Sequence, residues 1–190
     1  LQAMSLIPRE DFVEPTFRTR AYSDSALPIG AGQTISQPYT VASMSQALEA
    51  EPGMSVLEIG TGSGYQAAVL SLMGLRVYSI ERHRALHERA RATLEHLGCN
   101  VSLLHGDGSV GWSLNAPYDR IIVTAGAPEV PTVLLKQLAP DGRLVIPIGD
   151  RTTQRMEVVV RHGDRSEYDV FDYGEYRFVP LIGRTGWSGG

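Results

Sequence analysis

Apolar residues are spaced along most of this chain in two alternating patterns, a short β-rich run followed by a longer helical stretch. From residue 55 onward, runs of branched apolar residues predict strands, and apolar positions at helical spacing predict helices. The predicted strands span 56–59, 76–81, 101–107, 118–125 and 143–149. The predicted helices span 64–73, 83–97 and 130–138. This alternation is typical of an α/β domain with a parallel sheet.

Both ends of the chain depart from this repeat. The runs 156–163 and 168–181 are joined by Gly163 and Asp164 without a helical pattern, which predicts antiparallel strands at the sheet edge. Residues 26–38 fit no element, a helix is predicted from about 39 to 50, and LQAMSLIPRE at the start resembles the end of a helix, so we expect a further helix before it. We predict one domain with a Rossmann-like, mixed but mostly parallel sheet flanked by helices. Residues 1–50 form its N-terminal segment, 51–150 its core and 151–190 its C-terminal strands.

Length and charge exclude several classes of protein. A chain of 190 residues can bury a sizeable core without disulfides or metals. With a net charge of −4, the chain is not expected to have the basic surface that nucleic acid requires, so no nucleic-acid partner is expected. Apolar runs are far shorter than the roughly 20 residues of a membrane span, so no membrane partner is expected either. The single cysteine, Cys99, cannot form an internal disulfide, which favours the cytoplasm.

A glycine-rich turn follows the first core strand, in the sequence EIGTGSGY (58–65). Gly60, Gly62 and Gly64 let a ligand approach the backbone and the N-terminus of the next helix. The dinucleotide fingerprint has its third glycine where Tyr65 stands, which disfavours a nicotinamide cofactor without excluding it. A phosphate-binding Walker loop is ruled out more firmly, because Lys136 is the only lysine and it is far from this turn.

Two carboxylates stand at the ends of the next two predicted strands. Glu81 ends the second strand and Asp107 the third, and ligands of open α/β sheets bind at these carboxyl ends. A turn residue or a helix cap is the alternative for each. His83 and His87 have the i, i+4 spacing of zinc ligands but lack a third ligand, so no metal is predicted.

The EIGTGSGY loop resembles motif I of class I S-adenosylmethionine-dependent methyltransferases. The resemblance implies S-adenosyl-L-methionine as the cofactor and S-adenosyl-L-homocysteine as the product. It places the methionine end at the glycines, the ribose hydroxyls at Glu81 and the adenine amino group at Asp107. The cofactor contacts that it implies are Gln33, Thr34, Ile35, Ser36, Glu58, Gly60, Thr61, Gly62, Ser63, Gly64, Glu81, Arg82, Asp107, Gly108 and Thr124.

A second resemblance concerns the methyl acceptor and covers nearly the whole chain. ALPIGAGQTISQP (26–38), preceded by IPREDFVEP and AYSD and followed by HGDG, IIVTAGAPEVP and RFVPL, is similar to the protein-L-isoaspartate O-methyltransferase family. It implies methyl esterification of the α-carboxylate of L-isoaspartyl residues in damaged proteins and peptides. Separately, we expect a monomer. Ser36 is the position of the family's active-site serine, which we interpret as a polar contact. The substrate contacts that it implies are Leu27, Pro28, Ile29, Gly30, Val179, Pro180 and Leu181.

Several alternatives stay open at this point. An acceptor carboxylate, with a solution pKa near 4, is already ionised at neutral pH and needs positioning rather than a general base. Ser36 could instead be a helix N-cap, and RFVPL (177–181) an ordinary edge strand. Tyr39 stands where the family often has histidine. The alternative functions are methylation of another carboxylate or small molecule, or cofactor binding without catalysis.

Overall fold

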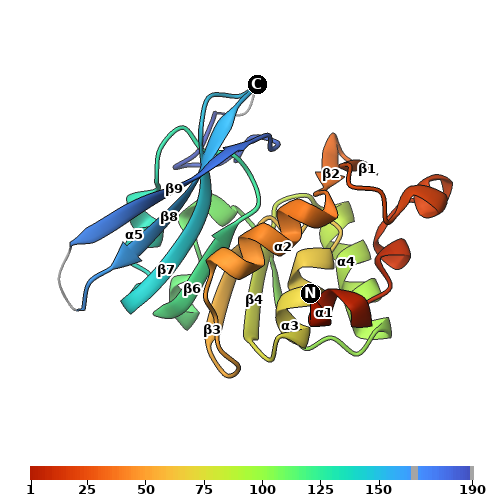
Figure 1. The fold of residues 1–190 in the computed structure, drawn as a ribbon, viewed down its shortest axis with the longest axis horizontal. Helices are drawn as coiled ribbons and strands as arrows, with labels where there is room; N and C mark the ends of the chain where they lie inside the picture. The colour runs from red at the N-terminus through yellow and green to blue at the C-terminus, as the bar shows by residue number, and fades with distance from the viewer. Residues whose placement is uncertain (164–166, 189–190) are drawn as a thin grey trace.

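The computed structural model describes residues 1–163 and 167–188, and its centre is a seven-stranded sheet (Figure 1). The strand order is β5-β4-β3-β6-β7-β8-β9. Neighbouring strands from β5 to β7 are parallel, whereas β8 and β9 are antiparallel additions, which confirms the mixed, mostly parallel sheet. The strands are β3 Ser55–Ile59, β4 Arg76–Glu81, β5 Val101–His105, β6 Tyr118–Val123, β7 Leu138–Gly149, β8 Gln154–Arg161 and β9 Tyr168–Tyr176.

The two helices that follow the glycine-rich turn, α3 and α4, begin and end close to their predicted limits. α3 lies between Gly64 and Gly74, and α4 ends two residues before Gly98. Glycine at Gly74 and Gly98 has positive φ, which ends each helix without the strain that a side chain would cause. The helices are α1 Gln2–Leu6, α2 Pro38–Ala47, α3 Tyr65–Leu72, α4 Arg84–His96 and α5 Thr132–Leu135, with 3-10 turns η1 Arg9–Phe12, η2 Pro15–Arg20, η3 Gly108–Val110 and η4 Ser113–Asn115.

The core lies on both faces of the sheet. Val56 of β3 packs in one cluster with apolar side chains of α2, α3 and α4. Its neighbour Leu57 points to the opposite face and packs in a second cluster with Leu134 of α5 and Tyr118 of β6. Because both faces are covered, β3 is buried along its whole length, as is typical of a central parallel strand. Ligands can therefore reach it only at its ends.

Two predictions for residues 130–149 are wrong in detail. The helix expected over 130–138 is the short α5, which begins after Pro131 and ends before Leu138 enters β7. The strand expected over 143–149 begins earlier, at Leu138, and Asp141, at φ 58°, interrupts it. Pairing between β6 and β7 shifts there, because Leu138 lies opposite Tyr118 and Arg143 opposite Arg120. Pairing with the long strand thus replaces the end of the predicted helix.

The segment 26–38, which fitted no element, contains a small hairpin. β1 Leu27–Gly30 and β2 Gln33–Ile35 pair antiparallel, separate from the main sheet. The turn between them has positive φ at Gly30, Ala31 and Gly32, a conformation for which glycine is suited. In Figure 1 the hairpin stands above the ends of α3 and α4, at the edge where β3 and β4 finish.

The C-terminal strands also end differently from their prediction. β9 stops at Tyr176, and residues 177–181 leave the sheet edge and cross to the end of β6. There the Gly126 amide donates to the Val179 carbonyl (2.8 Å), and the Leu181 amide donates to the Gly126 carbonyl (2.8 Å). The edge-strand interpretation of RFVPL is therefore wrong. Asp164, assigned to the turn before β9, lies outside the described residues.

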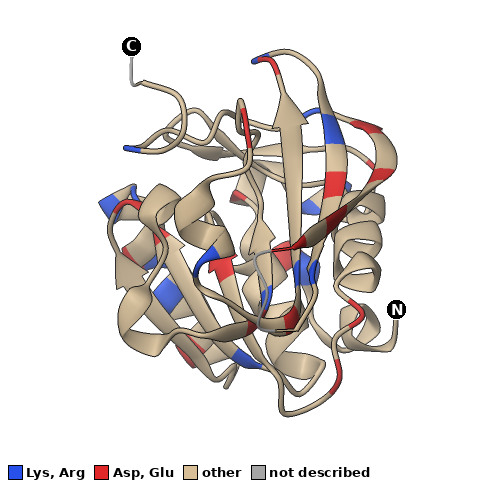
Figure 2. Cartoon of the chain, turned by 90° about the vertical axis from the view of Figure 1, so that its left-hand side faces the viewer, with Lys and Arg blue, Asp and Glu red and all other residues tan. Residues whose placement is uncertain are grey.

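The surface carries mixed charge. In Figure 2, which views the β9 side of the molecule, acidic and basic positions are interspersed rather than gathered into one basic face. Within residues 1–163 and 167–188, no helix combines the length and apolar character needed to cross a membrane.

Candidate functional site

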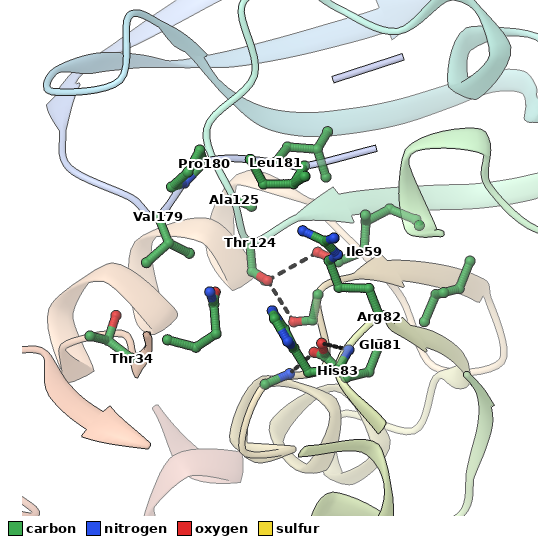
Figure 3. A pocket seen from close by; sticks show the side chains of 16 residues that line it. Thr34, Ile59, Glu81, Arg82, His83, Thr124, Ala125, Val179, Pro180 and Leu181 are labelled. Atoms are coloured by element: carbon green, nitrogen blue, oxygen red, sulfur yellow. Dashed lines mark hydrogen bonds between the residues drawn. The ribbon is translucent and has the colours of Figure 1, made fainter. Parts of the chain in front are cut away.

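Residues at the carboxyl ends of three neighbouring strands lie close together. The winding of the chain reverses between β3 and β6, because β4 and β5 lie on one side and β7 on the other. Ligands of open α/β sheets bind at such a switch point, outside the carboxyl ends of the strands. Gly60 follows β3, Glu81 ends β4, and Thr124 follows β6. All three line the same cavity (Figure 3).

This cavity, called here the Glu81 cavity, encloses about 570 Å³ counted to its open mouth. Apolar walls come from Ile59, Ile80 and the 179–182 segment, and polar groups come from both sides (Figure 3). The lining residues are Gln33, Thr34, Ile59, Gly60, Gly62, Ile80, Glu81, Arg82, His83, Gly108, Thr124, Ala125, Val179, Pro180, Leu181 and Ile182.

The Glu81 carboxylate is held in place by backbone amides. Its Oε2 accepts from the Gly62 amide (2.8 Å), and its Oε1 accepts from the His83 amide (2.8 Å). The residue is only 4% exposed, so the carboxylate is fixed at the inner end of the cavity. Each carboxylate oxygen has two lone pairs, so each keeps an acceptor position for a further donor. A pair of neighbouring hydroxyl groups on a ligand matches this arrangement.

Gly60 and Thr124 form the floor of the site. The Thr124 hydroxyl lies 2.6 Å from the Gly60 carbonyl oxygen and 3.0 Å from the Ile59 carbonyl oxygen, and it donates its one proton between them. Gly60 has φ 95°, and a Cβ atom there would lie 2.5 Å from Thr124 Oγ1. Glycine suits this position, because a side chain would be strained at this φ and would have to displace the Thr124 hydroxyl.

Two smaller cavities adjoin the Glu81 cavity. The Ser63 cavity is lined by Ser63, Tyr65 and Gln66 of the α3 end, and by Val41 and Met44 of α2. The Arg177 cavity is lined by Arg177 and Phe178, and by residues of the segment that joins β2 to α2. Thr34 and Thr124 line all three cavities, and Ser36 lines the two smaller ones. The three cavities therefore lie next to one another and share these residues in their walls.

Ser36 does not cap the following helix. α2 has Gln37 at its N-cap position and Pro38 at its start, without a side-chain cap bond. The Asp24 carboxylate accepts from the Tyr39 amide (2.9 Å) and serves the helix end instead. No group in the described part of the chain hydrogen-bonds the Ser36 hydroxyl. The N-cap interpretation is therefore wrong, and Tyr39 lines none of the three cavities.

Asp107 has partners within the chain. Its Oδ1 accepts from the Ser109 amide (2.9 Å) and hydroxyl (2.7 Å), and its Oδ2 accepts from the Arg184 amide (2.9 Å). Burial opposes ionisation, but these hydrogen bonds lower the pKa of the Asp107 carboxyl below its ordinary value. It caps η3 beside the Glu81 cavity, where its neighbour Gly108 forms part of the lining. Both the cap and the ligand-contact interpretations remain compatible with this position.

Glu58 lies beneath the site rather than in it. Its side chain is fully buried, and its Oε2 accepts from the Ser79 hydroxyl. Its Oε1 is buried without a hydrogen-bond partner among the residues that the structure describes. Burial, opposed by Ser79 and reinforced by the nearby Glu81 charge, raises the pKa of Glu58 to about 8. The glutamate is therefore protonated at neutral pH.

This protonation predicts a pH-dependent stability. Glu58 keeps its proton in the folded protein up to about pH 8, whereas the unfolded chain releases it near its ordinary pKa of 4.5. The folded state then binds more protons, so the free energy of unfolding falls as pH rises from 4.5 to 8, by up to a few kcal/mol. Glu58→Gln, which mimics the protonated form, should remove this decline in urea unfolding at pH 5 and pH 8. Equal pH dependence in both proteins would contradict the assignment.

Most of the predicted site residues line the three cavities, and seven do not. Leu27 and Ile29 are buried in the core, Pro28 and Gly30 lie on the hairpin surface, and Glu58, Gly64 and Asp107 lie behind the walls. Conversely, a further set of lining residues was not assigned from the sequence to the cofactor or substrate site. These are Ala26, Gln37, Thr40, Val41, Met44, Ile59, Tyr65, Gln66, Ile80, His83, Ala125, Arg177, Phe178 and Ile182.

The adjoining cavities can bind one elongated molecule and hold a second molecule next to it. The Glu81 cavity offers a carboxylate for hydroxyl groups and apolar walls for a flat ring, and the Ser63 cavity offers hydroxyls and an amide next to the α3 N-terminus. In the described ranges, no group of three or more His, Cys, Asp or Glu side chains is placed to hold a metal ion.

Comparison with known families gives a match over nearly the whole chain. Residues 1–186 match the family model described as protein-L-isoaspartate(D-aspartate) O-methyltransferase. A protein-L-isoaspartate O-methyltransferase of Cytophaga hutchinsonii is 50% identical over 188 residues, which cover 99% of this chain and 85% of the relative. One of Salinibacter ruber is 53% identical over 191 residues, covering 96% of this chain and 83% of the relative.

Solved structures agree with the fold. A protein-L-isoaspartate O-methyltransferase structure is 34% identical with a TM-score of 0.86, covering 97% of this chain and 61% of that one. A Plasmodium falciparum structure, solved in complex with S-adenosyl-L-homocysteine, has a TM-score of 0.79 at 23% identity and covers 95% of this chain and 88% of that one. At that identity the second likeness concerns the fold alone.

Proposed function

The chain belongs to the protein-L-isoaspartate(D-aspartate) O-methyltransferase family, and from this premise we propose how its three cavities divide the work of the reaction. The enzyme catalyses S-adenosylmethionine-dependent methyl esterification of the α-carboxylate of L-isoaspartyl residues. The alternatives, another methyl acceptor or cofactor binding without catalysis, are not favoured. Isoaspartyl proteins and peptides are its substrates.

The residues present fit the cofactor. Glu81 has acceptor positions for the ribose hydroxyls, and Gly60 and Gly62 leave the backbone open beside it. The Ser63 cavity, at the α3 N-terminus, would take the carboxylate of the methionine end. When bound, S-adenosylmethionine supplies the electrophilic methyl group of its sulfonium, and the acceptor carboxylate becomes a methyl ester. For Asp107 to accept a hydrogen bond from the adenine amino group, its Oδ2 would have to accept from that group and from the Arg184 amide at the same time.

The acceptor carboxylate would lie where the cavities meet. It is ionised at neutral pH, so the enzyme must orient it and exclude water rather than remove a proton. Ser36 and Thr34 provide hydroxyl donors from the β2 side, opposite Thr124. The observation that carries this proposal is the Ser36 hydroxyl, which lines both smaller cavities and has no partner in residues 1–163 and 167–188.

The proposal also assigns roles to the three parts of the chain. Residues 1–50 would cover the cofactor and bind the acceptor, residues 51–150 would hold the cofactor, and residues 151–190 would supply the wall formed by Val179, Pro180 and Leu181. A monomeric state and a cytoplasmic location remain predictions from the sequence.

One assay tests the proposed function. Two peptides that differ only in isoaspartate or aspartate at one position are incubated with the enzyme and labelled S-adenosylmethionine. We expect base-labile label on the isoaspartyl peptide alone, because a methyl ester hydrolyses in base. Label on both peptides would contradict the specificity. Binding of the cofactor without transfer to either peptide would favour the non-catalytic alternative.

Arg177 gives a prediction about peptide binding. Its exposed side chain lines the Arg177 cavity and the surface groove that continues from it past Gln37 and Thr40. Nothing in the described ranges pairs with its guanidinium, so it can attract an acidic peptide. Arg177→Ala should raise the KM for an isoaspartyl peptide by about tenfold, which corresponds to about 1.4 kcal/mol. Cofactor affinity should not change.

The matched control is Arg155→Ala, which removes an exposed arginine of β8 that pairs with Asp172 outside the cavities. It should leave the KM for the peptide unchanged. Equal KM values for all three proteins would remove Arg177 from the peptide groove.

A further inference from the structure

Arg9 is the most deeply buried charged residue of the N-terminal segment. It belongs to η1, and its side chain is only 1% exposed. No ion pair joins it to a carboxylate within the described part of the chain. Burial lowers the pKa of its guanidinium, although an arginine remains charged at neutral pH. The nearby Asp24 charge opposes this shift, but Nη1 is buried without a hydrogen-bond partner among the described residues, so burial of this guanidinium is unfavourable by itself and calls for an explanation.

The guanidinium of Arg9 joins four parts of the structure. Its Nε donates to the carbonyl of Ala21 (2.7 Å), which ends η2, and its Nη2 donates to the carbonyl of Ser36 (2.7 Å). Its Cζ atom lies 4.7 Å from the centre of the Tyr65 ring, which is a cation–π contact. Tyr65 begins α3, directly after the glycine-rich turn. One side chain thus connects the N-terminal segment with the helix of the cofactor site.

Both ends of this connection line the site. Ser36 and Tyr65 contribute to the Ser63 cavity, Ser36 from the segment after β2 and Tyr65 from α3. Arg9 itself lines none of the three cavities, so it acts behind their walls. Its planar guanidinium can hold two carbonyls and a ring face in fixed directions, which a lysine ammonium cannot. A displacement of about 1 Å in a reacting group can cost about a hundredfold in rate.

We propose that Arg9 is a positioning residue that holds Ser36 at a fixed distance from the cofactor helix, so that the acceptor carboxylate is aligned for methyl transfer. This inference rests on the proposed function. It predicts a larger effect on turnover than on cofactor binding, because Arg9 contacts neither Glu81 nor the glycines of the turn and lies behind Ser36 and Tyr65.

Arg9→Met and Arg9→Lys test this role, with wild-type enzyme and Arg120→Met as controls. Arg120 is a matched arginine, also buried (9% exposed), whose guanidinium donates to the Leu48 carbonyl (2.6 Å) and the Glu49 carbonyl (2.8 Å). It lies near the amino end of β6, away from the cavities. Kinetics with an isoaspartyl peptide are corrected for the folded fraction, and cofactor affinity is measured by calorimetry.

We expect both Arg9 variants to lose about ten- to a hundredfold in kcat. Their Kd for S-adenosylmethionine should stay within about threefold, while Arg120→Met loses thermal stability but keeps wild-type kcat. Wild-type kcat in Arg9→Met or Arg9→Lys, or an equal loss in Arg120→Met, would overturn the proposal. If Arg9→Met does not fold, Arg9→Gln takes its place under the same criteria. Wild-type enzyme without activity on the peptide would instead refute the proposed function.

Discussion

Glu81→Ala is expected to weaken binding of S-adenosylmethionine by about a hundredfold or more. The carboxylate is fixed by the Gly62 and His83 amides, and in the proposed complex it also accepts the two ribose hydroxyls. A hydrogen bond to a charged group contributes about 1.5–3 kcal/mol, so loss of two such bonds corresponds to a factor of at least about a hundred. Calorimetric titration of the folded variant with the cofactor measures the effect.

Two further variants separate this effect from general damage to the loop. Glu81→Gln keeps the size of the side chain and one acceptor oxygen, so it should lose less affinity than Glu81→Ala. Glu88→Ala removes an exposed glutamate of α4 that pairs with Arg84, outside the cavities, and should bind the cofactor as the wild type does. Unchanged affinity in Glu81→Ala would refute the ribose assignment.

Ser36→Ala is expected to lower kcat for the isoaspartyl peptide by about a hundredfold, the scale of losing one donor that orients a charged oxygen in an active site. Its thermal stability should change little, because the hydroxyl neither caps α2 nor bonds a described residue. The serine remains a contact to the acceptor or the cofactor, and no covalent intermediate is expected. Steady-state kinetics and thermal unfolding on the same samples test both expectations.

The control for Ser36 is Ser43→Ala on the neighbouring helix. The Ser43 hydroxyl hydrogen-bonds the Tyr176 hydroxyl (2.8 Å) between α2 and β9, and it lines none of the three cavities of the site. Its removal should cost about 1 kcal/mol of stability and leave kcat unchanged. If Ser36→Ala lost activity and stability in proportion, a structural role for Ser36 would be favoured instead.

Much of the core was predictable because its signals are local. The glycine-rich turn, the strands on either side of α3 and the limits of α4 follow from apolar spacing and from glycines that end helices. The predicted helix over 130–138 failed for a related reason. Its apolar residues satisfy a helix and a buried strand equally well, and pairing of Leu138 with Tyr118 decided between them.

The roles of Glu58, Ser36 and RFVPL depended on contacts between distant parts of the chain. Glu58 reads as a site residue because it opens the glycine motif, but the alternation of a strand turns its side chain into the core, toward Ser79. From the sequence, Ser36 could be a helix cap, but the structure shows that Asp24, 12 residues earlier, accepts the hydrogen bond from the first turn of that helix. RFVPL reads as an edge strand until its pairing with Gly126 is known.

The sequence by itself determined that this chain is an α/β protein with a ligand site at the ends of its central strands, because glycines, strand-end carboxylates and apolar periodicity act over a few residues. Only the tertiary structure decided which side chains share that site. Thr34 and Thr124 line the same cavity, and Arg9 contacts Ser36 and Tyr65, although these residues are far apart in sequence. Such contacts form when separate elements pack together, and no local pattern encodes them.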